Sequence, residues 1–328
     1  MSSSVKVGLL GCGIVGGSLV ELLAERGEAI EAATGLEFEI GSVAVRSASK
    51  ERPGLDSRLL TTDARALVSD PDIDIVVEVI GGIEPARELI LDAIKSGKPV
   101  VTANKELLAN CGAELYAAAS AAGVDLLFEA AAAGAIPIVR PLRESLLGED
   151  VTRVMGIVNG TTNFILTRMT EDGADYGDAL AEAQRLGYAE RDPTADVEGF
   201  DAGAKAAIMA SLAFGARVVA GDVYHEGISE VSQADIAFAN RHGYEIKLLA
   251  IAEVFEGATQ ADREIGVRVH PAMVPTAHPL ASVRDSFNAV FVEGSAAGEL
   301  MFYGRGAGGR PTASAVLGDL IDAGLNLA

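Results

Sequence analysis

Three glycines near the N-terminus constrain the fold more than any other feature of this sequence. They form the pattern Gly-x-Gly-x-x-Gly over residues 11–16, after the apolar run Val5–Leu10 and at the start of a helical pattern. In that context the first glycine allows a tight turn, the second lets backbone approach a pyrophosphate, and the third lets helix and strand pack closely. The pattern predicts a dinucleotide site, and the residues expected to line it are Gly11, Gly13, Ile14, Val15 and Gly16.

The segments that follow alternate between strand and helix patterns. Strands are expected at 40–45, 74–79, 99–102 and 124–128, and helices at 15–26, 63–68, 85–96 and 105–122. Apolar strands separated by helices indicate a parallel sheet that is covered on both faces. The fold class is therefore α/β, with an N-terminal Rossmann-type, doubly wound domain over 1–138.

The pattern changes after Pro141. Short strands are expected near 153–158, 246–254, 265–269, 289–292 and 300–303, with helices within 161–186 and at 201–213. This succession predicts a second, α+β catalytic domain over 151–303 with a mostly antiparallel sheet. A glycine-rich loop and a terminal helix complete the chain over 304–328, and we expect the helix at 309–328 to pack back near the first domain.

Charge and cysteine content exclude several functions. The net charge of −21 is spread along the chain and would repel nucleic-acid phosphates and anionic lipid heads. The longest uncharged stretch, Val269–Val283, contains three prolines and is too short to span a bilayer. Two cysteines cannot form a disulfide scaffold, which fits a reducing cytoplasm. We expect small-molecule or subunit partners and no nucleic acid or membrane.

The end of the second expected strand bears on cofactor choice. An acidic residue commonly binds the adenosine ribose at this point, but here the strand runs into Arg46-Ser-Ala-Ser-Lys50. Guanidinium, hydroxyl and ammonium groups complement a 2′-phosphate. Arg46 and Lys50 therefore predict a preference for NADP over NAD.

Two lysines stand out as candidates for chemistry. Lys105 follows a parallel strand at its carboxyl end, where ligands of open α/β sheets bind. Lys205 lies four residues after Asp201 on one face of an expected helix that is uncharged from 206 to 216. A lysine in so apolar a helix is expected to be buried and to need a partner or a function. Carboxylates crowd the preceding loop and suit an ammonium group: Glu190, Asp192, Asp196 and Glu198.

Residues 183–205 read Ala-x3-Gly-Tyr-Ala-x2-Asp-Pro-x2-Asp-Val-x-Gly-x-Asp-x3-Lys and closely resemble the motif of homoserine dehydrogenases. The segments 11–16, 102–105, 159–163 and 304–309 also look like that family, in the same order. The resemblance implies reversible, NAD(P)H-dependent reduction of L-aspartate 4-semialdehyde to L-homoserine, on the way to threonine and methionine. It implies a proton-donor role for Lys205 and a place near nicotinamide and substrate for Lys105.

Further roles follow from the resemblance. Substrate-binding positions are matched by Glu190, Gly187 and Asp201, to which the acidic loop adds Asp196. Cofactor positions are matched by Thr102, Lys105 and Gly306. A sodium site built largely from main-chain oxygens is matched by Glu129, Ala132, Gly134 and Ile136. The family is usually dimeric, and we expect the segment 139–150 to contribute to a homodimer. Because the chain stops at Ala328, we expect no C-terminal ACT domain.

Two other functions remain open at this point. Aspartate-semialdehyde dehydrogenase uses the same metabolite but needs a cysteine nucleophile, and neither Cys12 nor Cys111 has a histidine nearby in sequence. A non-catalytic NAD(P)-sensing module would keep the glycine turn but has no reason to keep Asp201 and Lys205. An NADP-dependent absorbance change with L-homoserine would separate the three functions.

The cofactor preference can be tested by reversing one charge. Arg46→Asp should repel a 2′-phosphate, so kcat/KM with NADP should fall relative to kcat/KM with NAD by about tenfold or more. Steady-state kinetics with both cofactors measures the ratio. An unchanged ratio would show that Arg46 does not select the cofactor.

Overall fold

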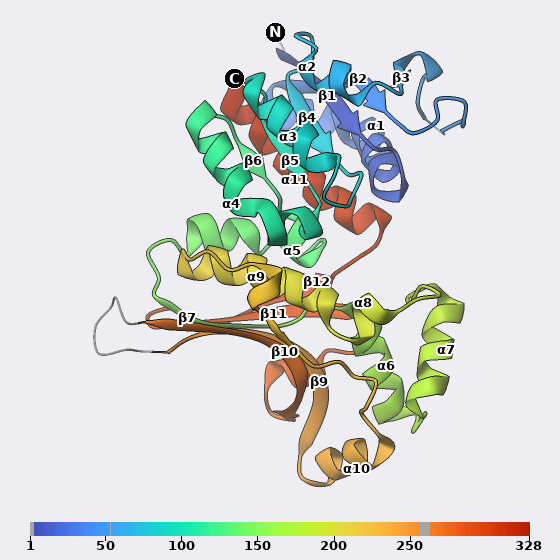
Figure 1. Ribbon diagram of the computed structural model, residues 1–328, viewed down its shortest axis with the longest axis vertical. Helices are drawn as coiled ribbons and strands as arrows, with labels where there is room; N and C mark the ends of the chain where they lie inside the picture. The colour runs from blue at the N-terminus through green and yellow to red at the C-terminus, as the bar shows by residue number, and fades with distance from the viewer. Residues whose placement is uncertain (1–2, 53, 256–262) are drawn as a thin grey trace. The chain divides into compact units, whose positions relative to one another are not determined.

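The computed structural model describes residues 3–52, 54–255 and 263–328 and divides the chain into two compact units (Figure 1). Unit 1 comprises residues 1–135 and 307–328, and unit 2 comprises residues 136–306. Each unit is built around its own six-stranded sheet.

The sheet of unit 1 is entirely parallel. Its strands are β1 (Ser3–Leu10), β2 (Leu36–Ala44), β3 (Leu60–Thr61), β4 (Ile75–Glu78), β5 (Val100–Thr102) and β6 (Leu126–Leu127). They are ordered β3-β2-β1-β4-β5-β6, so the direction of winding reverses between β1 and β4. Ligands of such sheets bind outside the carboxyl ends of the strands at this reversal. The predicted Rossmann-type sheet is confirmed.

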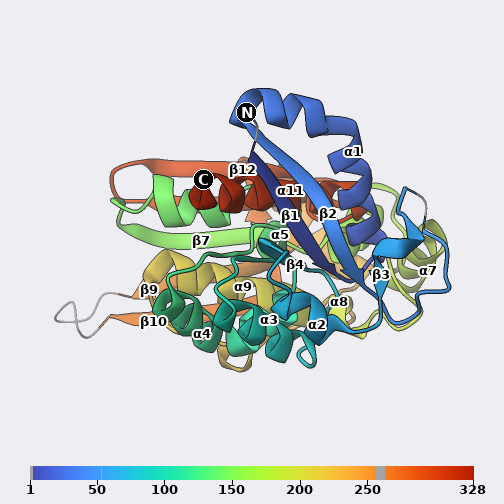
Figure 2. The same ribbon diagram turned by 90° about the horizontal axis from the view of Figure 1, so that it is seen from above.

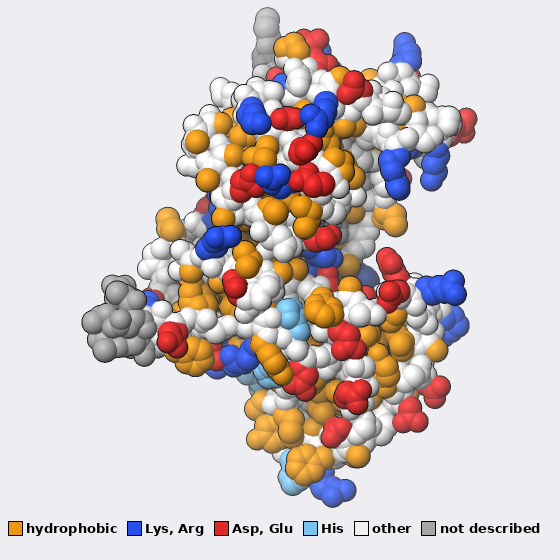
Figure 3. All heavy atoms as spheres, viewed as in Figure 1, with side chains coloured by type: hydrophobic (Ala, Val, Ile, Leu, Met, Phe, Trp, Pro, Cys, Tyr) orange, Lys and Arg blue, Asp and Glu red, His pale blue; other side chains and the backbone are white. Residues whose placement is uncertain are grey.

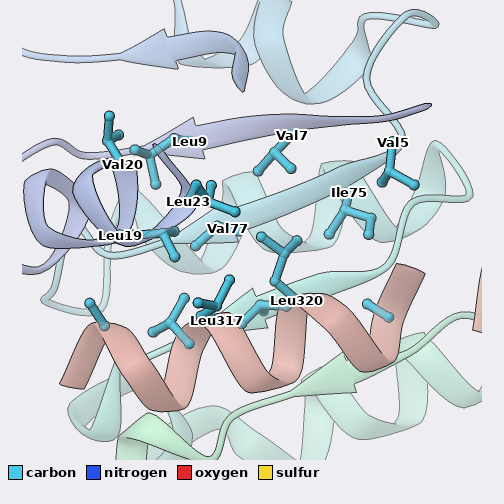
Figure 4. Close-up of a cluster of buried hydrophobic side chains, with 14 of the residues drawn as sticks. Val5, Val7, Leu9, Leu19, Val20, Leu23, Ile75, Val77, Leu317 and Leu320 are labelled. Atoms are coloured by element: carbon cyan, nitrogen blue, oxygen red, sulfur yellow. The ribbon is translucent and has the colours of Figure 1, made fainter. Parts of the chain in front are cut away.

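Helices cover both faces of this sheet (Figure 2). One face carries α1 (Ile14–Thr34) and α11 (Gly309–Leu327); the other carries α2 (Ala64–Ser69), α3 (Ala86–Lys95) and α4 (Lys105–Ala122). Figure 4 shows Leu317 and Leu320 of α11 beneath Leu9 and Val77 of the central strands. The last helix of the chain therefore completes the core of the first unit.

The first helix is longer than the sequence pattern predicts. We expect a helix over 15–26 and a strand from residue 40, but α1 continues to Thr34 and β2 begins at Leu36. Gly27 lies within the helix, and Gly35 ends it in the left-handed conformation with φ 76° and its N–H donating to the carbonyl of Glu31. Residues 28–34 are mostly good helix formers, so the chain tolerates one internal glycine.

The sheet of unit 2 is mostly antiparallel, as predicted. Its strands are β7 (Val151–Ile157), β8 (Tyr224–His225), β9 (Tyr244–Phe255), β10 (Glu264–Pro275), β11 (Phe287–Gly294) and β12 (Gly298–Arg305). Their order is β12-β11-β7-β9-β10-β8, and only the short β8 pairs in parallel.

Helix α9 (Phe200–Phe214) packs against β7, β9 and β10 (Figure 1). The other α-helices in the described part of unit 2 are α6 (Gly160–Glu171), α7 (Tyr176–Leu186), α8 (Thr194–Val197) and α10 (Gln233–Arg241). A hydrophobic core cluster of unit 2 contains Leu280, Leu249 and Phe291. The segment 139–150, which is expected to contribute to a homodimer, contains a π-helical turn at Pro141–Ser145.

A buried lysine anchors one corner of unit 2. Lys247 on β9 is 2% exposed, and its Nζ donates to the carbonyl of Val283 at 2.6 Å. Burial lowers the pKa of Lys247 to about 8, although the nearby charge of Glu245 opposes that shift. The carbonyl of Val283 belongs to the turn before β11, and the hydrogen bond from Lys247 stabilises that turn. We therefore assign this lysine a structural role.

Surface features agree with the charge pattern. In the face that Figure 3 shows, acidic side chains are spread over both units. Within the described residues, every helix is too short or too polar to cross a membrane.

Candidate functional site

The glycine turn at the end of β1 requires Gly11 and Gly16 for steric reasons. Gly11 has φ 97°, and a Cβ on Gly16 would lie 2.4 Å from the carbonyl oxygen of Gly11. At Gly13, apart from its chain neighbours, the described chain leaves open space for 4 Å around the point a Cβ would occupy. No side chain among the described residues caps α1, so its first N–H groups, at the positive end of a 21-residue helix, suit a phosphate. Ile14 is 78% exposed there, and Val15 follows it.

Arg52, which no sequence pattern singled out, is hydrogen-bonded to the basic loop after β2. Arg46 and Lys50 are exposed, and Arg52 Nη1 donates to the carbonyls of Ser47 at 3.2 Å and Lys50 at 2.7 Å. Burial raises the pKa of the Cys12 thiol, and the positive charge of Arg52 opposes that rise. Arg52 therefore lies close enough to the glycine turn to influence it, and Cys12 is a protonated thiol at neutral pH.

Lys105 begins α4 at the carboxyl edge of the parallel sheet. The preceding residue, Asn104, caps the helix by accepting from the N–H of Leu107 at 3.1 Å. Buried Glu78 accepts from the hydroxyl of Thr102 at 2.6 Å, and that hydroxyl accepts from the N–H of Asn104. The Thr102 hydroxyl therefore serves this network, and Glu78, which sequence analysis missed, holds the segment that presents Lys105.

Lys205 and Asp201 form a buried ion pair in unit 2. Lys205 Nζ lies 2.7 Å from Asp201 Oδ2, and the two side chains are 9% and 8% exposed. The same Nζ donates to the carbonyl of Val158, just after β7, at 2.6 Å. A Cβ on Gly203, between the pair, would lie 2.0 Å from His225 Nε2, so a larger residue there would displace that ring. The expected i,i+4 contact is present, and it is buried rather than a solvated surface pair.

A second carboxylate joins this pair through an asparagine. Asn159 Nδ2 donates to Asp196 Oδ1 at 2.7 Å and to Asp201 Oδ2 at 3.0 Å. Asp196 comes from α8 and is half-buried. The structure therefore brings Asp196, Asp201 and Lys205 together, whereas the sequence offered Asn159 only as part of a matching motif.

The rest of the acidic loop divides by partner. Asp192 accepts from the N–H and hydroxyl of Thr194, and these bonds lower the pKa of Asp192. Glu198 accepts from the hydroxyl of Ser229 at 2.8 Å. Both carboxylates thus accept hydrogen bonds from neighbouring hydroxyls, whereas Glu190 is exposed.

Gly187 ends α7 in the left-handed conformation with φ 81°. The next carbonyl, that of Tyr188, accepts from the hydroxyl of Thr161 in the first turn of α6 at 2.7 Å. This bond ties the loop that carries Gly187 and Glu190 to the helix that follows Asn159.

The residues matched to a sodium site lie within α5 (Ala130–Ala133) and at its two ends. Glu129 is buried, and its N–H donates to Asp319 Oδ2 of α11 at 2.7 Å. Ala132 is buried and Gly134 has φ 63°, while Ile136 is the first residue of unit 2. Across the described ranges no cluster of three or more His, Cys, Asp or Glu side chains suits a metal ion. A cation here would depend mainly on main-chain oxygens.

Gly306 is constrained by a buried asparagine. A Cβ at Gly306 would lie 1.8 Å from Asn288 Nδ2. Within the part of the chain that the structure describes, Asn288 Oδ1 is buried without a hydrogen-bond partner. No sequence pattern singles out Asn288, because only the fold brings it against the glycine-rich segment.

A cavity of about 830 Å³ in unit 2 borders the acidic loop. Its lining includes Glu198 of that loop with Phe200, Tyr224, His225 and Phe238, but not Asp196, Asp201 or Lys205. Concavity alone would therefore have pointed away from the acid–base cluster.

Comparisons with known proteins cover both units. The family model "Homoserine dehydrogenase" matches residues 137–321, and "Homoserine dehydrogenase, NAD binding domain" matches residues 11–129. The homoserine dehydrogenase of Corynebacterium glutamicum is 59% identical over 99% of this chain and 73% of its own length.

Solved structures agree. A homoserine dehydrogenase from Thiobacillus denitrificans superposes with a TM-score of 0.93 at 48% identity, over 98% of this chain and 73% of that one. A hyperthermophilic archaeal homoserine dehydrogenase in complex with NADPH superposes with a TM-score of 0.84 at 30% identity, over 99% of this chain and 98% of that one.

Proposed function

This chain belongs to the homoserine dehydrogenase family, an NAD(P)-dependent oxidoreductase family of amino-acid biosynthesis, and we propose that its Lys205–Asp201 pair carries the acid–base step. The reaction is the reversible reduction of L-aspartate 4-semialdehyde to L-homoserine. The observation that supports this assignment is the buried contact of 2.7 Å between an ammonium and a carboxylate in an otherwise apolar helix.

The proposed reaction is a reduction by hydride transfer. When bound, the reduced nicotinamide would supply a hydride to the aldehyde carbon, and the electron pair of the C=O bond would move to oxygen. Lys205, or a water that it polarises, donates a proton to that oxygen, which becomes the hydroxyl of L-homoserine. Asp201 holds the Lys205 ammonium in place before the transfer, because its Oδ2 accepts a hydrogen bond from Nζ at 2.7 Å.

The remaining polar groups would bind the substrate. Glu190, Asp196 and Asp201 supply negative charge for its amino group, with Gly187 in the same loop. Lys105, at the edge of the parallel sheet, supplies a positive charge for the substrate carboxylate or the developing alkoxide. The raised pKa of Cys12 disfavours the thioester chemistry of an aspartate-semialdehyde dehydrogenase.

NADP is the proposed cofactor in preference to NAD. Arg46, Lys50 and Arg52 gather positive charge after β2, and the hydroxyls of Ser47 and Ser49 lie 2.9 Å apart in the same loop. The phosphate-binding residues would be Gly11, Gly13 and Gly16. Thr102 and Gly306 would make further contacts with the cofactor. The free thiols of Cys12 and Cys111 support a cytoplasmic location.

Loss of the Lys205 ammonium should slow chemistry more than binding. In Lys205→Met, kcat should fall by about 100-fold or more while KM changes only a few-fold, because proton donation acts in the transition state. Lys247→Met, which removes the structural lysine of unit 2, is the matched control and should keep kcat. Steady-state kinetics on variants with measured Tm gives the comparison; an unchanged kcat in Lys205→Met contradicts the role.

A sodium ion held by Glu129, Ala132, Gly134 and Ile136 is a further part of the proposal, since buried oxygen donors suit a hard cation. Sodium chloride should raise kcat over tetramethylammonium chloride at equal ionic strength. Gly134→Ala should raise the sodium concentration for half activation several-fold, because its φ of 63° disfavours a side chain. Gly97→Ala, with φ 75°, is the matched control. Equal rates in the two salts would contradict the site.

We also propose a homodimer that uses the segment 139–150. Leu147 in this segment is 78% exposed, which supports its burial against a second copy. Light scattering at micromolar concentration should give twice the monomer mass, and Leu147→Glu should shift the mass toward the monomer. Leu325→Glu alters another exposed leucine, 47% accessible, and should leave the dimer intact. A monomeric native protein would contradict this proposal.

A further inference from the structure

Asn159 occupies the point where the polar groups of unit 2 converge. It follows β7 and precedes α6, so its backbone continues from the Val158 carbonyl that accepts from Lys205. Its side chain is buried, with 5% exposure. Both ends of its amide are used, and they serve different purposes.

The oxygen end of the amide holds the helix. Asn159 Oδ1 accepts from the N–H of Thr162 at 2.9 Å, which is an N-cap of the 12-residue α6. The hydroxyl of Thr162 lies 3.0 Å from the same oxygen. These contacts define which end of the amide is oxygen, because the backbone N–H can only donate.

The nitrogen end holds two carboxylates that come from different helices. Nδ2 has two N–H donors, and it lies 2.7 Å from Asp196 Oδ1 and 3.0 Å from Asp201 Oδ2. Asp201 Oδ2 also accepts from Lys205. Two carboxylates this close repel each other, and a neutral donor between them lowers that cost without neutralising either charge.

We propose that Asn159 is a positioning residue of this reaction, whose amide fixes the carboxylate that binds the substrate amine relative to the carboxylate that holds the proton donor. The proposal rests on the function proposed above. It assigns to one neutral side chain the alignment between Asp196 on α8 and the Lys205–Asp201 pair on α9.

Two variants separate positioning from capping. Asn159→Ser keeps a good N-cap residue but its short hydroxyl cannot bridge both carboxylates, and Asn159→Asp keeps the cap while replacing both donors by an acceptor. Each should lower kcat at least tenfold and raise KM for L-homoserine several-fold. Asp63→Ala, which removes the cap of α2 in unit 1, is the control for cap loss and should lower Tm without lowering kcat.

The pH profile distinguishes the two variants from each other. A carboxylate at position 159 adds negative charge beside Asp196, Asp201 and Lys205, and a like charge disfavours the ionised form of the two aspartates. The acid limb of the profile, which is the fall of kcat/KM at low pH, should therefore move to higher pH by about one unit in Asn159→Asp. The limb should stay in place in Asn159→Ser. In the Lys205→Met background, Asn159→Ser should add little further loss, because the two residues act on one step.

Wild-type kcat and KM in both folded variants would overturn the proposal and leave Asn159 as a cap alone. Additive losses in the Lys205→Met background would also overturn it. If Lys205→Met itself kept full activity, the proposed function would fail instead, so the two failures are distinguishable. Should Asn159→Asp not fold, Asn159→Ser with its unshifted limb and the double variant still decide the matter.

Discussion

The buried ion pair between Lys205 and Asp201 is the interaction on which the proposed chemistry of unit 2 depends. Charges with exposures of 9% and 8% are tolerated only when they are paired and hydrogen-bonded, because each loses most of its hydration. The Val158 carbonyl and the Asn159 amide complete that environment. The ends of β7 and α6 are thereby joined to α9. Such an arrangement is less stable than an apolar core, and this cost is expected where a buried charge serves a function.

The proposed sites of the two units depend on different physical requirements. The proposed anion site of unit 1 is built from backbone, so its requirements are steric: a Cβ added to Gly16 would lie 2.4 Å from the carbonyl oxygen of Gly11. The proposed site of unit 2 is built from charged side chains, so its requirements are electrostatic. Burial alone does not identify such a side chain: Lys247 is buried too, but its partner at Val283 belongs to a structural turn.

Much of the fold follows from local pattern. Strand–helix alternation predicts the parallel sheet, and the change after Pro141 predicts the antiparallel one. Short elements such as β8 and α8 were not predicted, since two to four residues carry little periodic signal and depend on their neighbours. The end of α1 was placed too early because Gly27 resembles a stop signal, although only Gly35 adopts the left-handed conformation that ends the helix.

From the sequence alone come the glycine turn, the i,i+4 spacing of Asp201 and Lys205, and the basic residues after the second strand, because each depends on residues that are near one another in the chain. Tertiary structure decided that Asn159 bridges Asp196 and Asp201 across 37 and 42 residues, and that Glu78 holds Thr102 across 24. Those contacts join separate elements, and hydrogen bonding between side chains acts over about 3 Å in space, whatever their separation along the chain.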